Sequence, residues 1–168
     1  MNEDKIIIYS DGAARGNPGP AGWGVVFILG KKVFEIGGRE KYATNNQMEL
    51  TATIEALKYL NRHPHICVKQ DLTQKKIEMF CDSKYVILGI TEWIGNWMKN
   101  NWRNAAKKPV LNRDLWEELY GLVQEFTCPP NGRELKWNYV EGHSGDKYND
   151  RADFIATSFA DDEPVELF

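Results

Sequence analysis

The sequence predicts an α/β fold, with a five-stranded mixed sheet flanked by helices. Two observations predict this fold. Residues 5–11, 22–29 and 32–41 have strand-like apolar patterns and short connections, which is typical of an antiparallel meander. Helical and strand-like segments alternate along the rest of the chain, and strands that are joined through a helix usually run parallel. We therefore expect the fourth and fifth strands to lie parallel to the first.

The segment after the meander predicts the first long helix, over residues 44–63. Thr44 or Asn45 is suited to cap its start, and Pro64 lies beyond its end. A polar connection of uncertain form, residues 63–76, leads to "KKIEMFCDSKYV". This stretch has the pattern of a fourth strand that runs directly into a helix.

The second half of the chain supplies the remaining elements. Residues 83–100 have a helical pattern with a break near Gly89–Thr91. The segments that follow are a basic loop (101–111), an amphipathic helix (112–126), a fifth strand (134–140) and a loop leading into a final helix (142–160).

The chain is expected to form one domain. Its 168 residues, of which 42% are hydrophobic, are enough for a sizeable core, and no internal repeat or linker divides residues 1–160. Residues 161–168 contain four acids and no base, and we expect them to form a disordered acidic tail.

Composition also indicates the surroundings of the protein. No apolar run approaches the roughly 20 residues that cross a bilayer, and the first residues lack a signal-peptide core, so no membrane partner is expected. The cysteines Cys67, Cys81 and Cys128 are an odd number without CxxC spacing, which disfavours a disulfide framework or a zinc site. We expect a cytoplasmic monomer with buried thiols.

The formal net charge of −3 hides a separation of charges. Between residues 93 and 113 there are five basic side chains and no acid. A protein that is acidic overall can present one basic face, so the net charge does not exclude a nucleic acid as partner.

Two aspartates stand at the predicted ends of strands. Asp11 closes the first strand and Asp82 the fourth, and parallel neighbours would bring both carboxylates to the same edge of the sheet. Taken singly, each has an ordinary explanation, because Asp-Gly is a common turn pair and Asp-Ser is a common start of a helix.

Glu49 is harder to explain as a surface residue. At about 100° per residue it falls within the apolar arc of the predicted helix, so it should face the sheet. A buried carboxylate needs a proton, an ion-pair partner or a metal ion. With Asp11 and Asp82 opposite, a divalent metal ion is the best compensation.

The last helix and the loop before it supply two further candidates. Asp153 borders the apolar side of the helix, whereas Asp150 points further out, although a first-turn acid is also favoured by the helix dipole alone. His143 lies in the loop "VEGHSGD", where an imidazole could carry a proton. A lone histidine on a loop is otherwise often incidental.

Carboxylates that converge in this way repel one another and need cations. Oxygen ligands without a cluster of Cys or His suit Mg²⁺ or Mn²⁺ better than zinc. Two such ions about 4 Å apart are a common arrangement for in-line displacement at a phosphodiester.

Five blocks of the sequence, in order, resemble the type 1 ribonuclease H family. They are "YSDGAARGNPGPAGWG", "TNNQMEL", "CDSKYV", "ITEWIGNWMKNNWRNAAKKPVLNRDLW" and "WNYVEGHSGDKYNDRADFIA", and they lie within residues 5–160. The resemblance implies a ribonuclease H-like fold and hydrolysis of the RNA strand of RNA–DNA hybrids with Mg²⁺ or Mn²⁺, leaving 5′-phosphate and 3′-hydroxyl ends. It places the metal ligands on Asp11, Glu49, Asp82 and Asp153, and the histidine of the catalytic loop on His143.

The resemblance also implies which residues bind the hybrid. The glycine-rich loop after Asp11 would follow the minor groove, where backbone without side chains can come close. Ribose 2′-hydroxyls are displayed in that groove and distinguish RNA from DNA. The implied contacts in the minor groove are Asn17, Asn45 and Gln47, and Thr44 would be available to hold a backbone phosphate. Gly12 and Ser83 are also expected to bind the substrate.

A basic protrusion is implied as a second contact, with the phosphates of the substrate. Its implied contact residues are Lys99, Trp102, Arg103, Lys107 and Lys108, whereas Trp93 and Trp97 are expected in the core. Met98, Asn100 and Leu111 stand where many bacterial members carry additional positive charge.

Other classes of protein share parts of this pattern. Integrases and resolvases have the same fold and cut DNA, but the hybrid-contacting loop and the basic protrusion count against them. A non-catalytic hybrid-binding module would not need four carboxylates. A small-molecule phosphoesterase would not need the basic segment 93–113.

Overall fold

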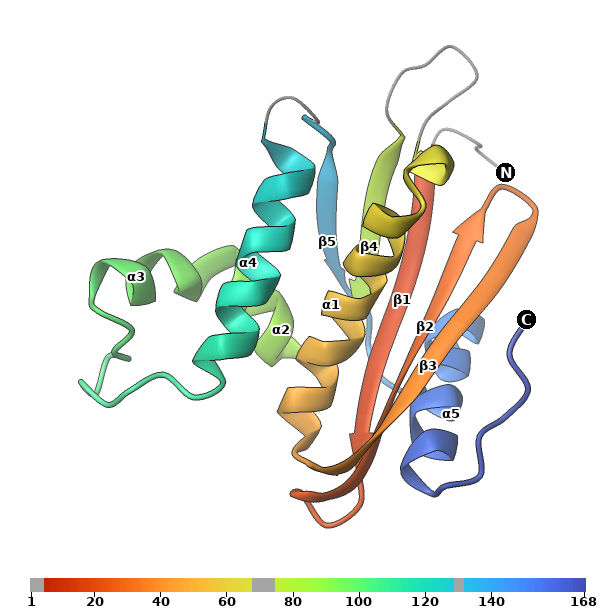
Figure 1. Ribbon diagram of the computed structural model, residues 1–168, viewed down its shortest axis with the longest axis horizontal. Helices are drawn as coiled ribbons and strands as arrows, with labels where there is room; N and C mark the ends of the chain where they lie inside the picture. The colour runs from red at the N-terminus through yellow and green to blue at the C-terminus, as the bar shows by residue number, and fades with distance from the viewer. Residues whose placement is uncertain (1–4, 68–74, 129–131) are drawn as a thin grey trace.

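The structure, a computed structural model, describes residues 5–67, 75–128 and 132–168. Within these ranges five strands form one sheet in the order β3-β2-β1-β4-β5. They are β1 (Lys5–Ala14), β2 (Gly19–Leu29), β3 (Lys32–Ala43), β4 (Lys76–Cys81) and β5 (Leu135–Tyr139). The first three strands form an antiparallel meander, and β4 and β5 run parallel to β1. The predicted fold class is confirmed (Figure 1).

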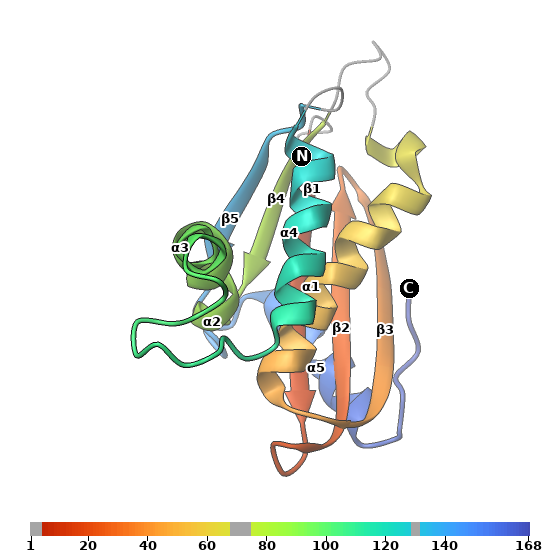
Figure 2. The ribbon, with the colours of Figure 1, turned by 60° about the vertical axis from the view of Figure 1, so that its left-hand side comes forward.

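Helices cover both faces of the sheet (Figures 1 and 2). Helices α1 (Asn45–Arg62) and α4 (Arg113–Thr127) lie together on one face, and α5 (Lys147–Ala160) lies on the other. The shorter elements are the 3₁₀ turn η1 (Pro64–Cys67), α2 (Lys84–Leu88), the π-helix η2 (Gly89–Trp93) and α3 (Ile94–Lys99). Half of the predicted 63–76 connection, residues 68–74, lies outside the described residues. None of the helices described here is long and apolar enough to cross a membrane.

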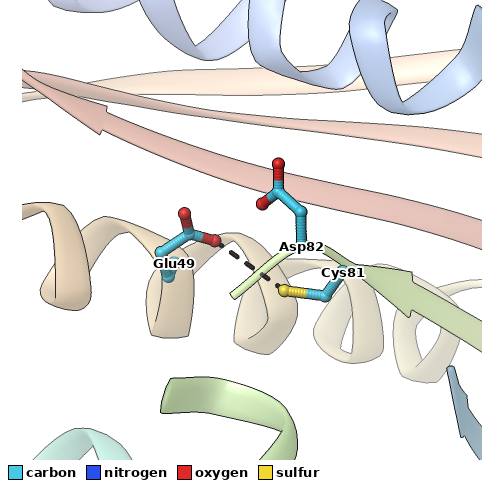
Figure 3. A group of neighbouring side chains, drawn as sticks. All are labelled: Glu49, Cys81 and Asp82. Atoms are coloured by element: carbon cyan, nitrogen blue, oxygen red, sulfur yellow. Dashed lines mark hydrogen bonds between the residues drawn. The ribbon is translucent and has the colours of Figure 1, made fainter. Parts of the chain in front are cut away.

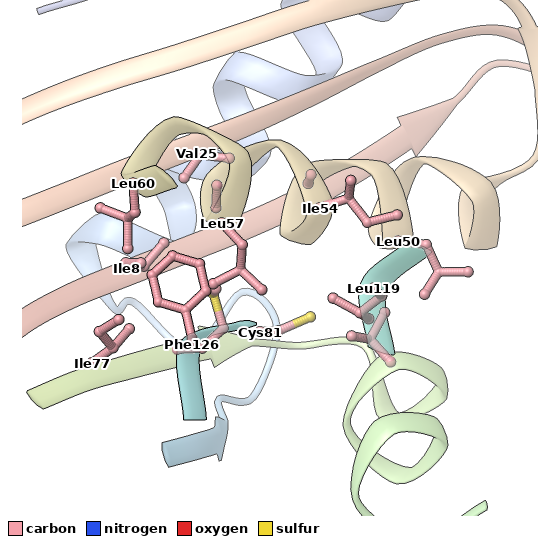
Figure 4. Close-up of a cluster of buried hydrophobic side chains, with 14 of the residues drawn as sticks. Ile8, Val25, Leu50, Ile54, Leu57, Leu60, Ile77, Cys81, Leu119 and Phe126 are labelled. Carbon is pink, nitrogen blue, oxygen red and sulfur yellow. The ribbon is translucent and has the colours of Figure 1, made fainter. Parts of the chain in front are cut away.

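The larger part of the core lies between the sheet and the pair of helices α1 and α4. Ile8, Val25 and Ile77 from the sheet meet Leu57 of α1 and Phe126 of α4, and all five side chains are fully buried (Figure 4). Full burial of one such side chain stabilises the fold by about 1.5–3 kcal/mol. This layer of the core fixes α1 against the sheet, and it therefore also fixes the position of the side chains in the first turn of α1.

β1 extends beyond the predicted end of the strand. The sequence predicts that the strand ends at Asp11, but its antiparallel pairing with β2 continues to Ala14. The parallel pairing of β1 with β4 stops earlier, at Ser10 opposite Cys81. Asp11 therefore lies one residue beyond the end of the parallel pair, next to Asp82, which directly follows β4.

Two glycines of the first loop region allow helices to approach the sheet closely. A Cβ atom on Gly12 would overlap the backbone nitrogen of Glu49 in α1, and one on Gly22 would overlap the carbonyl oxygen of Ala156 in α5. The resemblance implies that glycines here approach a nucleic acid, but at these two positions the structure shows helix packing. The first turn of α1 consequently touches β1 immediately after Asp11.

The predicted break in the helix after β4 is present. At Gly89 the helical path widens into the π-helix η2, which separates α2 from α3. A Cβ atom on Gly89 would overlap the indole of Trp116, a fully buried side chain of α4. Packing against this ring therefore requires glycine. Beyond η2, α3 and the loop that follows it project away from the sheet (Figure 1).

The acidic segment 161–168, expected to be a disordered tail, makes specific contacts in this structure. Asp161 forms a bidentate ion pair with Arg15 at N–O distances of 2.6 Å. At the end of the chain, the carbonyl oxygen of Phe168 accepts a hydrogen bond of 2.7 Å from the backbone nitrogen of Glu35 in β3. An acidic composition is typical of disorder, but here the acids find cationic partners that lie far away in the sequence.

A buried ion pair anchors this tail. Arg151 of α5 donates to both carboxylate oxygens of Glu35, at 2.8 and 2.7 Å, and to the carbonyl oxygen of Glu166 at 2.8 Å. The side chain of Glu35 is only 2% exposed. Removal of Arg151 would leave a buried carboxylate without its partner, which is strongly unfavourable.

We predict that Arg151→Met lowers the free energy of unfolding by about 2 kcal/mol, measured by urea denaturation. The effect is smaller than for a fully enclosed pair because Arg151 itself is partly exposed. The control is Lys76→Met, which breaks the exposed ion pair between Lys76 and Glu134 and should have little effect. Equal decreases in the free energy of unfolding of the two variants would contradict a special contribution from the buried ion pair.

Candidate active site

Asp11 and Asp82 lie at the edge of the sheet where the pairing of β1 with β4 ends. Asp11 is 5% exposed, and its Oδ1 accepts a hydrogen bond of 2.7 Å from the backbone nitrogen of Gly12. Asp82 is partly buried and precedes Ser83, whose hydroxyl caps α2 by accepting from the backbone nitrogen of Val86 at 3.3 Å. The strand register and the start of α2 thus fix the two aspartates.

Glu49 enters the site from the first turns of α1. The Thr44 hydroxyl accepts from the backbone nitrogen of Gln47 at 3.2 Å, and the side-chain oxygen of Gln47 accepts from the backbone nitrogen of Thr44 at 2.9 Å. This reciprocal capping box fixes the start of the helix. Figure 3 shows Glu49 beside Asp82 and the Cys81 thiol, and one ligand atom from each of the three lies within 4.8 Å of the others.

Asp153 comes to the same place from α5. It is partly buried, whereas Asp150 is exposed. His143 lies on the loop before α5, and its Nδ1 is 3.9 Å from Oδ2 of Asp153. The His143 side chain is 85% exposed, so the imidazole can exchange protons with water while it stays near Asp153.

Burial and repulsion by neighbouring acids raise the pKa values of Asp11, Glu49 and Asp153. Burial, with the nearby charges of Asp82 and Asp153, raises the pKa of Asp11 to about 7. Burial also raises the pKa of Glu49 well above its usual value, and the charges of Asp11 and Asp82 act in the same direction. The pKa of Asp153 is raised by burial, an effect that His143 opposes. Without a counter-charge, Asp11 and Glu49 are therefore shifted toward their protonated forms.

The available ligands fit a hard divalent cation. Asp11, Glu49, Asp82 and Asp153 offer only oxygen atoms, which Mg²⁺ and Mn²⁺ prefer. Cys81 supplies one thiol near Glu49, whereas a structural zinc site is usually built from several Cys or His ligands. Burial raises the pKa of this thiol well above its usual value. A divalent cation would relieve the repulsion that raises the pKa values of the acids.

The loop between β1 and β2 and the start of α1 form one exposed surface beside the acids. The backbone nitrogen of Ala14 donates to Oδ1 of Asn45 at 2.6 Å, and the backbone nitrogen of Asn45 donates to Oδ1 of Asn17 at 2.9 Å. These bonds join the loop to the helix. The predicted substrate contacts that the structure brings together here are Gly12, Asn17, Thr44, Asn45 and Gln47.

The predicted basic protrusion consists of α3 and the loop that leads to α4. Its exposed basic residues are Lys99, Arg103, Lys107 and Lys108. Trp102, which is predicted to contact the substrate, is mostly buried in this structure. It is only 9% exposed, its ring centroid lies 6.4 Å from that of Trp97, and the guanidinium of Arg113 covers the ring at 5.1 Å. Trp102 therefore has a packing role in the base of the protrusion.

Two residues that contact Asp82 are absent from the predicted set. Asn149 of α5 is 1% exposed, and its Nδ2 donates to Oδ2 of Asp82 at 3.3 Å. A Cβ atom on Gly142 would lie 2.8 Å from the same oxygen. The sequence contains a signal for Asn149, because its spacing from Asp153 and Ala156 places a polar residue on the apolar side of the helix. Gly142 has no such signal.

Comparison with known proteins identifies relatives along the whole chain. The family model described as RNase H matches residues 3–161. The ribonuclease H of Thermosynechococcus vestitus is 45% identical over 161 residues, which cover 95% of this chain and 91% of the relative. The ribonuclease H of Ruthia magnifica is 48% identical over 153 residues, which cover 91% of this chain and 93% of the relative.

Solved structures have the same fold. LC9-RNase H1, described as a type 1 RNase H with the type 2 active-site motif, has a TM-score of 0.75 at 24% identity and covers 100% of this chain and 78% of its own. LC11-RNase H1, solved in complex with an RNA/DNA hybrid, has a TM-score of 0.67 at 26% identity, with coverage of 94% and 97%. On the evidence of the family model and the relatives, this chain belongs to the RNase H family.

Proposed function

We propose that this protein hydrolyses the RNA strand of RNA–DNA hybrids with two divalent cations, leaving 5′-phosphate and 3′-hydroxyl ends. The observation that carries the proposal is the convergence of four carboxylates, from β1, α1, the end of β4 and α5, at one edge of the sheet. Membership of the RNase H family and the hybrid-bound relative LC11-RNase H1 support the hybrid as substrate. We further propose that the protein acts as a cytoplasmic monomer.

Asp11, Glu49, Asp82 and Asp153 would hold the cations, which we propose to be Mg²⁺ with Mn²⁺ as a substitute. When bound, such a pair of ions supplies an activated water and positive charge at the leaving oxygen. The chain itself fixes the positions of the acids through the register of β1 and β4, the capped start of α1 and the packing of α5. This preorganisation is what the folded protein contributes to the reaction.

His143 is proposed to move a proton during the reaction. Its imidazole is exposed and lies 3.9 Å from the carboxylate of Asp153. Histidine is a common general acid or base in catalysis, and the exposed ring is accessible to water.

The surface around the acids has two parts that suit a hybrid duplex. The exposed amides of Asn17 and Asn45 lie beside the site, where they could meet the minor groove and its ribose 2′-hydroxyls. The exposed lysines and arginine of the protrusion, with Ser83 at the start of α2, would contact phosphates. Phosphate contacts provide affinity without sequence preference.

We predict that the protein cleaves only the RNA strand of a hybrid and requires Mg²⁺ or Mn²⁺. The assay compares a hybrid, duplex DNA and duplex RNA, with each strand labelled in turn. Asp11→Asn should abolish cleavage, because it removes a metal ligand, while a gel-shift assay should still detect hybrid binding. Asp150→Asn makes the same change at an exposed acid and should remain active.

Other outcomes would favour other functions. Cleavage of DNA alone would indicate a DNA nuclease or integrase of the same fold. Binding of the hybrid without turnover by the unaltered protein would indicate a non-catalytic hybrid-binding module.

The raised pKa of Asp11 predicts how stability depends on pH in the absence of metal. Its pKa rises from 3.8 to about 7 on folding, so the folded state binds this proton more tightly and stability falls as pH rises through this range. We predict a lower melting temperature at pH 8 than at pH 6 in EDTA, measured by calorimetry. Asp11→Asn should stabilise the metal-free protein at pH 8 by ~2–4 kcal/mol and should flatten this dependence. An unchanged pH dependence in this variant would exclude Asp11 as a source of the repulsion.

We predict that the double variant Lys107→Glu/Lys108→Glu raises KM for the hybrid without changing kcat. It should also reduce the salt dependence of binding by about one unit of logarithmic slope for each phosphate that the variant no longer binds. The control is Lys31→Glu/Lys32→Glu in the turn between β2 and β3, which makes the same change in charge at the other end of the sheet. Equal effects of both double variants would show a general effect of charge and no specific binding by the protrusion.

A further inference from the structure

The side chain of Asn149 is enclosed in the protein beside Asp82. It is 1% exposed, and its Nδ2 donates to Oδ2 of Asp82 at 3.3 Å. The other polar atom of the amide, Oδ1, is buried and has no hydrogen-bond partner among the residues that the structure describes. A buried amide with an unpaired oxygen is unfavourable for folding, so packing alone gives no reason for asparagine at this position.

The same oxygen of Asp82 is enclosed from a second direction. A Cβ atom on Gly142 would lie 2.8 Å from Oδ2 of Asp82, so the loop before His143 passes close to the carboxylate at a position without a side chain. A larger residue at position 142 would require the carboxylate or the loop to shift. Oδ2 of Asp82 is therefore held between an amide of α5 and the backbone of this loop.

We propose that Asn149 and Gly142 form a seat that fixes the orientation of the Asp82 carboxylate for metal binding, with Asn149 as a positioning residue. The inference rests on the proposed function, because it takes Asp82 to be a metal ligand. A hydrogen bond to one carboxylate oxygen restricts rotation of the group, and so determines where the other oxygen points. Partners of this kind typically change metal affinity about 10- to 100-fold when they are removed.

The seat also joins three parts of the site. Asn149 and Asp153 lie one turn apart on α5, and Gly142 precedes His143 in the chain. Asp82, at the end of β4, touches both segments through Asn149 and Gly142. The position of Asp82 is consequently tied to the helix that carries Asp153 and to the loop that carries His143.

The test is Mn²⁺ binding to the full chain without nucleic acid, measured by titration calorimetry. Asn149→Ala and Gly142→Ala disturb the seat from its two sides, and each should weaken Mn²⁺ binding about 10-fold. The control is Gly121→Ala in α4, where an added Cβ atom meets no other atom within 4 Å. It should leave the affinity unchanged. Thermal unfolding of each metal-free variant establishes that the protein is folded.

Asp82→Asn separates this inference from the proposed function. Loss of Mn²⁺ binding in Asp82→Asn supports the metal site itself, whatever the other variants do. The proposed role of Asn149 and Gly142 alone would be overturned if both variants fold and their affinities for Mn²⁺ lie within about twofold of that of the unaltered chain. If Asn149→Ala does not fold, Gly142→Ala decides the question. An unaltered chain that binds no Mn²⁺ would overturn both proposals.

Discussion

Repulsion between closely placed acids is the constraint on which the rest of this structure depends. Burial and neighbouring charges push Asp11 and Glu49 toward their protonated forms. Each acid is carried by a different element, and contacts away from the site anchor each of these elements. β1 is paired on both sides, α1 begins with a reciprocal cap, and α5 packs tightly across the opposite face of the sheet. The fold thus keeps together groups that would otherwise separate.

Close backbone contacts provide much of this rigidity. Glycine at positions 12 and 22 lets α1 and α5 approach the sheet from its two faces, and Gly142 brings the loop of His143 against Asp82. The tail adds a further link, because the ion pair between Arg15 and Asp161 joins the first loop to the end of α5. The loop expected to meet the substrate and the helix that carries an acid are therefore connected directly, and both are held beside the carboxylates.

The sheet and the positions of the acids can be predicted from local sequence patterns. Contacts between residues that are far apart in the sequence cannot be predicted in this way. Asp11 and Asp82 can be placed because parallel strands share an edge, and Glu49 because it interrupts an apolar helix face. Trp102 cannot be assigned in this way, since a basic segment rich in tryptophan has the same composition whether its rings face a substrate or the core. The contacts of residues 161–168 involve Arg15 and Glu35, which lie far away in the sequence, and no local pattern contains that information.

The most direct test of the central claim is a crystal structure with Mn²⁺ and a hybrid that carries a non-hydrolysable linkage, analysed by anomalous scattering. We predict two peaks about 4 Å apart, both bounded by Asp11, Glu49, Asp82 and Asp153. Carboxylates that are gathered with no peak between them, or that move apart when the hybrid binds, would contradict a catalytic site built on divalent cations.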